Sequence, residues 1–404
     1  MKKFGYLALT VRNSCEDMMR NMRTISSMIG MVGLLVVGFV SVSQAAVLTK
    51  EDFNLYGYVD ASYTHNFNNP NSQTNALRIF DGDANSFRPH MAQIVFEKEG
   101  KSDGTNVDRA GFRIKLNFGE DAKFTGGNTG ADEVDFQEAY AQYIAPFGNG
   151  LDLRIGRMNT LIGYEVIESP LNPNFSRSWL FGLGEPFTTT GIRASYQFDD
   201  VVTFSIGAIN SFGGAEVDAN RSKSVEALLG LNPLEWLSVS IFGFWGPEGT
   251  VGAKNADRVQ IGGIITAQAT AQTSFVLEGY YGNQANATPG RNARWNGIAG
   301  YVIHDFDEQW GIRLRGEMFE DAQGFFGCGG TAGTAGNANT CFGGLAPASQ
   351  TLWEGTATLQ YKLTQSLITR LEFRYDKSNK NTFQYGQRAA NNQETLATEV
   401  IYLF

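Results

Sequence analysis

Histidine and cysteine are scarce in this sequence, with three of each among 404 residues. None of them has the spacing of a metal site, and neither a phosphate-binding loop nor a glycine-rich dinucleotide motif is present. Hydrolytic enzymes need a nucleophile or an activated water beside a positioned base. The histidines, His65, His90 and His304, fall near predicted loops or strand ends and suggest no Ser-His-acid grouping. We therefore expect no catalytic residues, no metal site and no cofactor, and a hydrolase is the least favoured class.

Long apolar runs are also missing beyond the N-terminal segment. After residue 45, no stretch approaches the roughly 18 apolar residues of a membrane-spanning helix. Only helices and closed barrels satisfy every backbone polar group in lipid. If the chain crosses a membrane after residue 45, we therefore expect it to do so as a β-barrel.

Basic residues are the minority charge. Five of the 32 basic and two of the 41 acidic residues lie within residues 1–45, so the remainder carries a net charge of −12. Proteins that bind nucleic acid are usually basic, so we expect no nucleic-acid partner. Proline is limited to 10 residues, whereas glycine reaches 47 and aromatic residues 12%. This composition suits a barrel whose strands are polar on one face, although a soluble β-protein with many turns would share it.

The N-terminal segment has the three parts of a secretory signal peptide. An uncharged apolar run covers residues 28–42, and Arg20 and Arg23 precede it. A small-x-small triplet follows and ends at Ala45, so cleavage would leave Ala46 as the first mature residue. The alternative is a retained transmembrane helix, because about 20 apolar residues suffice to span a bilayer.

Two regions follow from this assignment. Residues 1–45 form the signal peptide, within which residues 1–21 are unusual and Met22 is the more ordinary start. Residues 46–404 contain no linker or composition break and are expected to form one domain. An exported domain that crosses a membrane as a barrel belongs in the outer membrane of a Gram-negative cell.

The last ten residues alternate strictly between two faces and end on an aromatic residue. Such period-two alternation is typical of a strand with two different surroundings. Tyr402 and Phe404, two residues apart at the end of the chain, resemble the signal that the barrel-assembly machinery reads in the last strand of outer-membrane barrels. We therefore expect that machinery to be a partner.

The same alternation recurs along the chain, with charges in mid-strand. Arg113 and Lys115, for example, alternate with Ile114 and Leu116. No helix is predicted to cover either face, and a lipid-embedded barrel turns such charged rows towards a wet lumen. The prediction is an all-β fold, a transmembrane antiparallel β-barrel of about 16 strands. The strands are expected near residues 52–65, 87–98, 109–118, 134–145, 150–158, 189–198, 201–210, 222–231, 236–245, 257–268, 273–282, 294–303, 309–319, 351–362, 366–376 and 394–404.

The connections alternate between short and long, as periplasmic turns and external loops do in such barrels. The turn at residues 99–108 is long for a periplasmic one, and the register of residues 87–92 is not fixed by their pattern. The long connections are predicted at residues 66–86, 119–133, 159–188, 211–221, 246–256, 283–293, 320–350 and 377–393.

The third long loop, residues 159–188, is unusually apolar for a surface loop and needs something to pack against. The lumen of a 16-stranded barrel is wide enough for this loop to fold inward and narrow it. Glu165 and Glu168 would then face bases on the wall and set a transverse field that screens solutes by charge. The bases expected to form this pore constriction are Arg113, Lys115, Arg154 and Arg193. The alternative is that these groups form ion pairs that only fix the loop.

Several runs make a family resemblance specific. GRMNTLIGYEVIESPLNPNFSRSWLFGLGEPFTTTGIRASYQF, NSFRPHMAQIVFEKEG, GFRIKLNFGEDAKF and LRGEMFED resemble segments of the OmpL-like outer-membrane β-barrel porins. The likeness covers most of the chain after residue 45.

The resemblance implies an outer-membrane barrel with a pore function and leaves the solute open. The partners expected are outer-membrane lipid and lipopolysaccharide, small hydrophilic solutes or ions, and further copies of the chain in a homotrimer. The competing class is a structural or adhesin-like barrel with a plugged lumen.

Cys328 and Cys341 lie in a glycine-rich stretch of the seventh long loop, with no His or carboxylate between them to favour a metal site. In an exported chain we expect them to form a disulfide, which would restrict the open states of a loop with little core. Mass spectrometry of unreduced protein from the native membrane should find the linked peptides. Two free thiols there would show this prediction to be wrong.

Overall fold

The protein is described from a computed structural model that covers residues 53–103, 105, 108–125, 133–218, 220–249, 256–288, 291–326 and 349–404. Sixteen antiparallel strands close into one barrel, as predicted. The strands that form it are β1 (Asn54–Asn66), β2 (Ser86–Lys98), β3 (Ala110–Phe118), β4 (Val134–Ala145), β5 (Leu151–Asn159), β6 (Thr188–Gln197), β7 (Val202–Ile209), β8 (Ser224–Leu234), β9 (Leu237–Pro247), β10 (Asp257–Gln268), β11 (Thr273–Thr288), β12 (Arg291–Asp305), β13 (Trp310–Asp321), β14 (Gln350–Lys362), β15 (Leu367–Ser378) and β18 (Asn392–Leu403).

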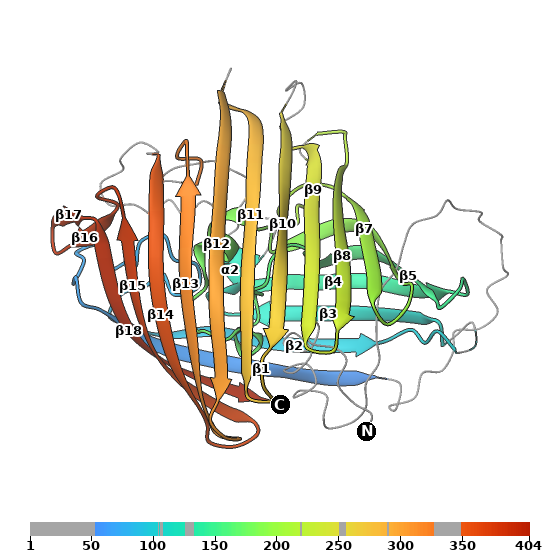
Figure 1. Ribbon diagram of the computed structural model, residues 1–404, viewed down its shortest axis with the longest axis horizontal. Coiled ribbons are helices and arrows are strands. Elements are labelled where there is room, and N and C mark those ends of the chain that lie inside the picture. The colour runs from blue at the N-terminus through green and yellow to red at the C-terminus, as the bar shows by residue number, and fades with distance from the viewer. Residues whose placement is uncertain are drawn as a thin grey trace.

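The barrel closes where the last strand meets the first. β18 pairs with β1 from Tyr58 opposite Leu403 to Asn66 opposite Thr395. At the lower end of this seam, Gly57 and Phe404 exchange backbone hydrogen bonds of 3.0 and 3.1 Å between N and O. In Figure 1, β9 to β13 stand upright in front and β1 to β5 cross behind them, so the strands wrap round into a continuous wall.

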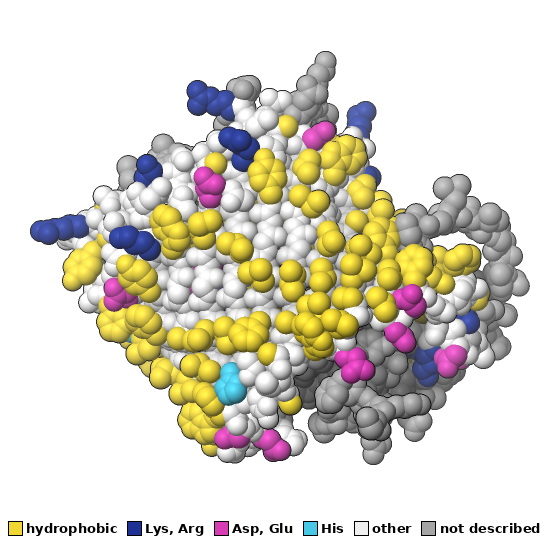
Figure 2. All heavy atoms as spheres, viewed as in Figure 1, with side chains coloured by type: hydrophobic (Ala, Val, Ile, Leu, Met, Phe, Trp, Pro, Cys, Tyr) yellow, Lys and Arg dark blue, Asp and Glu magenta, His cyan; other side chains and the backbone are white. Residues whose placement is uncertain are grey.

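The two faces of each strand have the surroundings that the alternation predicts. On β1, Leu55 and Val59 are exposed outward, whereas Asp60, Ser62 and Thr64 are buried towards the inside. Figure 2 shows apolar side chains in a broad band across the visible wall and charged side chains near its two rims. An apolar band between charged rims is the outer surface that a lipid bilayer requires of a barrel.

Three local features differ from the prediction. The long connection expected at residues 283–293 is mostly strand, because β11 and β12 extend to Thr288 and from Arg291. The connection near residues 377–393 contains a small hairpin of β16 (Phe383–Tyr385) and β17 (Arg388–Ala390). In β2 the pairing with β1 shifts between Asp60 and Ala61, which explains why the register of residues 87–92 could not be assigned.

Short helical segments occur only in connections within the described part of the chain. They are α2 (Ala122–Thr125), η2 (Ser169–Leu171) and α3 (Trp179–Gly184). Among the described residues, no helix has the length and apolar character needed to span a bilayer.

Gly57 gives a test of how tightly β1 packs against β2 and the end of the chain. A Cβ atom added at Gly57 would lie 2.0 Å from the Gln93 carbonyl oxygen and 2.9 Å from Phe404 Cζ, whereas at Gly355 it would meet nothing within 4 Å. Gly57→Ala should therefore destabilise the folded barrel by roughly 1–3 kcal/mol, the usual range for overpacking. The matched control Gly355→Ala should be neutral or slightly stabilising. Urea unfolding of both variants in detergent micelles measures this, and equal stability of the two would contradict the prediction.

Candidate functional site in the lumen

The loop between β5 and β6, residues 160–187, packs against the inner face of the barrel. It carries η2 and α3, and its side chains Ile162, Phe175, Trp179, Leu180 and Phe181 are all buried. Trp179 and Leu180 belong to an apolar cluster that includes inward residues of several strands, such as Tyr280, Tyr301 and Phe319. The apolar character of the loop therefore reflects packing against the inside of the barrel.

The backbone N–H groups of this loop are satisfied by carboxylates of the wall. Two successive amides donate to Glu372 on β15, and two more at the start of α3 donate to Glu317 on β13. The donors and N···O distances are Phe175 (2.7 Å) and Ser176 (2.9 Å) to Glu372, and Trp179 (2.8 Å) and Leu180 (2.6 Å) to Glu317. Each carboxyl group thus accepts two loop amides, one with each of its oxygens.

The carbonyl groups of the loop are satisfied by arginines of the same wall. Three guanidinium groups on β13 and β15 donate to loop oxygens, and each also contacts a carboxylate. These bonds run from Arg315 to Ser176 O (2.6 Å), from Arg370 to Ser169 O (3.1 Å) and Asn172 O (2.7 Å), and from Arg374 to Arg177 O (2.6 Å). The corresponding ion pairs are Arg315–Glu354, Arg370–Glu399 and Arg374–Asp376.

Glu168 contacts one of the bases named from the sequence. Its carboxylate touches Lys115 Nζ, and it also accepts from Gln137 Nε2 at 2.7 Å. Lys115 lies 2.9 Å from Glu138 as well, so one ammonium serves two carboxylates. Burial alone would raise the pKa of Glu168, but Lys115 outweighs it and holds that pKa below its usual range. Glu168 is therefore ionised at neutral pH.

Glu165 contacts none of the four predicted bases and instead pairs with Arg315. The two side chains are 2.8 Å apart, and the carboxylate also accepts from Ser178 N at 2.7 Å. Lys115 on β3 and Arg315 on β13 are separated in barrel order by β2, β1, β18, β15 and β14. The two loop carboxylates therefore anchor the loop on different parts of the wall.

The other three predicted bases pair with acids of the wall. The pairs are Arg113–Glu138 (3.1 Å), Arg154–Asp152 (2.8 Å) and Arg193–Glu226 (2.7 Å). The side chain of Arg193 is buried, whereas those of Arg154 and Arg113 remain 25% and 14% exposed. Arg154 and Arg113 are thus the water-facing members of the predicted set.

A second loop, residues 67–85, also packs inside the wall and was not anticipated. Its Arg78 pairs with Asp376 on β15 at 2.7 Å, and Leu77 O accepts from Trp179 Nε1 at 3.0 Å. Leu77 and Phe80 have φ of 59° and 69°. Such left-handed conformations cost roughly 1–3 kcal/mol each unless the surroundings enforce them, and here both side chains are buried.

The structure also brings together three residues that the sequence did not connect. Ser62 Oγ lies 2.6 Å from His90 Nε2, and His90 Nδ1 lies 3.2 Å from Asp121 Oδ1. The sequence suggested no such grouping, because its members are distant in sequence. The bulge in β2 and the turn into α2 place them side by side. Asp60, whose carboxylate accepts from Met91 N at 2.9 Å, is a further acid near this histidine.

Some residues named from the sequence lie outside the described residues. These are Cys328, Cys341 and the cleavage pair Ala45 and Ala46. The expected assembly signal is described: Tyr402 and Phe404 are both exposed on the outside of the barrel.

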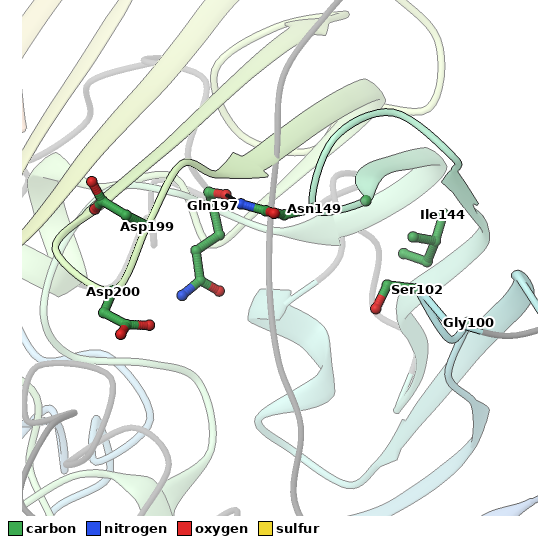
Figure 3. Close-up of a pocket in the computed structure, with 8 residues that line it drawn as sticks. Gly100, Ser102, Ile144, Asn149, Gln197, Asp199 and Asp200 are labelled. Atoms are coloured by element: carbon green, nitrogen blue, oxygen red, sulfur yellow. Dashed lines mark hydrogen bonds between the residues drawn. The ribbon is translucent and has the colours of Figure 1, made fainter.

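A small polar hollow opens among the connections that follow β2, β4 and β6 (Figure 3). It has a volume of about 330 Å³ and is lined by residues that include Ser102, Asn149, Gln197, Asp199 and Asp200. Asn149 Nδ2 donates to Gln197 O at 3.1 Å, and Asp199 accepts from the amides of its own turn. The polar groups are used to shape the turns, so this hollow is not the candidate site.

Metal chemistry finds no support in the described ranges. No group of three or more His, Cys, Asp or Glu side chains there is placed to hold a metal ion.

With this geometry established, the family can be stated. The family described as "Putative beta-barrel porin-2, OmpL-like" matches residues 52–404. The chain belongs to this family of porin-like outer-membrane barrels. No curated protein matches its sequence.

Solved structures with the same fold include several porins and channels. The anion-selective porin from Comamonas acidovorans shares 11% identity and a TM-score of 0.57, over 87% of this chain and 99% of that one. The outer-membrane channel DcaP of Acinetobacter baumannii shares 12% identity and a TM-score of 0.56, over 89% and 100%. OprB of Pseudomonas putida shares 11% identity and a TM-score of 0.57, over 88% and 94%. These similarities define the fold, and together with the family they support a location in the outer membrane.

Proposed function

We propose that this protein is an outer-membrane porin that forms a narrow, water-filled channel for passive diffusion of small hydrophilic solutes or ions. The observation that carries the proposal is the loop at residues 160–187, anchored inside the barrel by Glu168–Lys115 on one part of the wall and Glu165–Arg315 on another. A loop held by ion pairs on two parts of the wall narrows the lumen and stays in place.

The constriction is proposed to lie between this loop and the wall formed by β3 to β6. That wall carries Arg113, Lys115, Arg154 and Arg193. The side chains of Arg113 and Arg154 are partly exposed. Cationic groups that face water attract anions, while Glu168, paired with Lys115, lowers the net charge beside them. Two inward loops fill part of the lumen, which favours small solutes over large ones.

A homotrimer is the proposed assembly. One of the similar structures is the trimer form of OmpT, an outer-membrane protein of Vibrio cholerae, at 11% identity and a TM-score of 0.53 over 87% of this chain and 99% of that one. The proposal for this chain rests on the shared fold.

The test is conductance of the purified protein in a planar bilayer, with reversal potentials measured in a salt gradient. Replacing Glu165 and Glu168 together by Gln removes negative charge and leaves Lys115 and Arg315 less compensated, so selectivity should shift towards anions. Arg154→Gln should shift it towards cations, and the opposite signs make each variant the control for the other. Absence of conductance would favour a plugged structural barrel. An unchanged reversal potential in conducting variants would leave these groups a purely structural role.

The Ser62, His90 and Asp121 chain raises a hydrolase as the second candidate. Two observations weigh against it. Ser62 lies in the middle of a ladder-paired strand, where its N–H is not free to stabilise an oxyanion. Only 7% of its surface is exposed, so a substrate has little access to its hydroxyl group. We propose that Ser62, His90 and Asp121 form a hydrogen-bonded group with a purely structural role, in which His90 and Asp121 are an ion pair.

A fluorophosphonate probe, which labels activated serines, tests this interpretation. We expect no labelling of Ser62, with His90→Gln giving the same result as the unaltered protein. Labelling that is lost in both Ser62→Ala and His90→Gln would contradict the proposal and revive the hydrolase.

A further inference from the structure

Glu185 has no hydrogen-bond donor for either side-chain oxygen among the described residues. It follows α3 directly, at the end of the loop at residues 160–187, and only 1% of its surface is exposed. A buried carboxylate without a donor or a counter-charge is costly, because neither water nor protein stabilises its negative charge.

The group beside Glu185 is another buried carboxyl, that of Glu278 on β11. One Glu278 oxygen accepts from Tyr164 N at 2.9 Å, and the other has no donor. Glu185 lies against Gly163, and Glu278 is bound to the N–H of the next residue, so the two carboxyl groups meet at the start of the loop. Two ionised carboxylates have acceptors only, so a hydrogen bond between them requires a proton on one of them.

The groups that face this pair do not supply a positive charge. Glu165 from the loop and Glu317 from β13 are further carboxyl groups near the pair, and Tyr280 from β11 lies beside it and donates its hydroxyl to Leu180 O. Arg315, the base bound to Glu165, is also held by Glu354. Like charges this close favour retention of one proton by the pair.

The surroundings of the pair do not form a metal site. A Cβ atom at Gly163, whose φ is +90°, would lie 1.7 Å from Glu185 Oε2, so the carboxyl group rests directly against the backbone. Calcium would need six to eight oxygen ligands. In the described ranges, no cluster of three metal-binding side chains includes these residues.

We propose that Glu185 and Glu278 share one proton, and that this hydrogen bond is a pH-sensitive latch that fastens the base of the loop to β11. The two ends of the loop meet at this point, where Glu185 lies against Gly163 and Glu278 binds Tyr164. One shared proton therefore holds both ends of the loop to β11. Burial, and then the charge of Glu278, raise the pKa of Glu185 well above its usual range. The latch is therefore closed at acidic and neutral pH and opens as pH rises through the raised pKa, because the folded state then loses a proton that it bound more tightly than the unfolded chain.

Infrared difference spectroscopy of the detergent-folded protein tests the proton directly and does not depend on channel activity. At neutral pH the unaltered protein should show a protonated carboxyl band that disappears on titration to alkaline pH. Glu185→Gln and Glu278→Gln should each lose one protonated carboxyl, because the introduced amide donates to the remaining carboxylate. Glu308→Gln, which removes an exposed carboxylate from a short turn, is the matched control and should keep the band. An identical band in Glu185→Gln would overturn the proposal.

The latch itself is tested in planar bilayers, and this arm rests on the proposed channel function. Current through the unaltered protein should become noisier at alkaline pH, as the loop loosens. Glu278→Gln should lose this pH response, because Gln keeps a donor at every pH. The same alkaline transition in Glu278→Gln would overturn the latch. A protein that conducts no current would contradict the channel function, while the infrared result would still decide whether the proton is shared.

Discussion

The constraint on which the rest of the structure depends is the satisfaction of loop backbone inside the barrel. A loop placed in the lumen has no strand to pair with, and each buried N–H or C=O group without a partner is costly. Here Glu317 and Glu372 accept from loop amides, and Arg315, Arg370 and Arg374 donate to loop carbonyls. Charged side chains of the wall thus provide the hydrogen-bond partners that a neighbouring strand would provide in a sheet.

This arrangement explains why so many charges lie on the inner face and are paired. An arginine that donates to a carbonyl still needs a carboxylate to balance its charge, and an ionised carboxylate that accepts from an amide needs a base nearby. The network around Arg315, Glu354, Arg374 and Asp376 meets both needs together. The same groups therefore fix the loop and set the electric field beside it.

Both inward loops depend on one another as well as on the wall. Trp179 of α3 donates its indole N–H to Leu77 of the other loop, and Arg78 holds that loop to Asp376. The left-handed backbone of Leu77 and Phe80 is retained because both side chains are packed in the apolar clusters. The width of the lumen is therefore decided jointly by two segments that are far apart in sequence.

The sequence by itself determined the barrel, since a strand with mid-strand charges and an alternating apolar face has one arrangement that suits both lipid and a polar interior. Alternation located the 16 strands, and the apolar residues of the third loop indicated its packing. Only the tertiary structure decided the partners. Arg315 and Glu372 lie on predicted strands. Arg315 pairs with Glu165, and Glu372 accepts from the Phe175 and Ser176 amides, only because of how the loop crosses the lumen. Barrel closure and loop folding bring distant segments together, and only this places Ser62 beside His90 and Asp121, and Glu185 beside Glu278. Periodicity along one strand does not encode contacts between such distant segments.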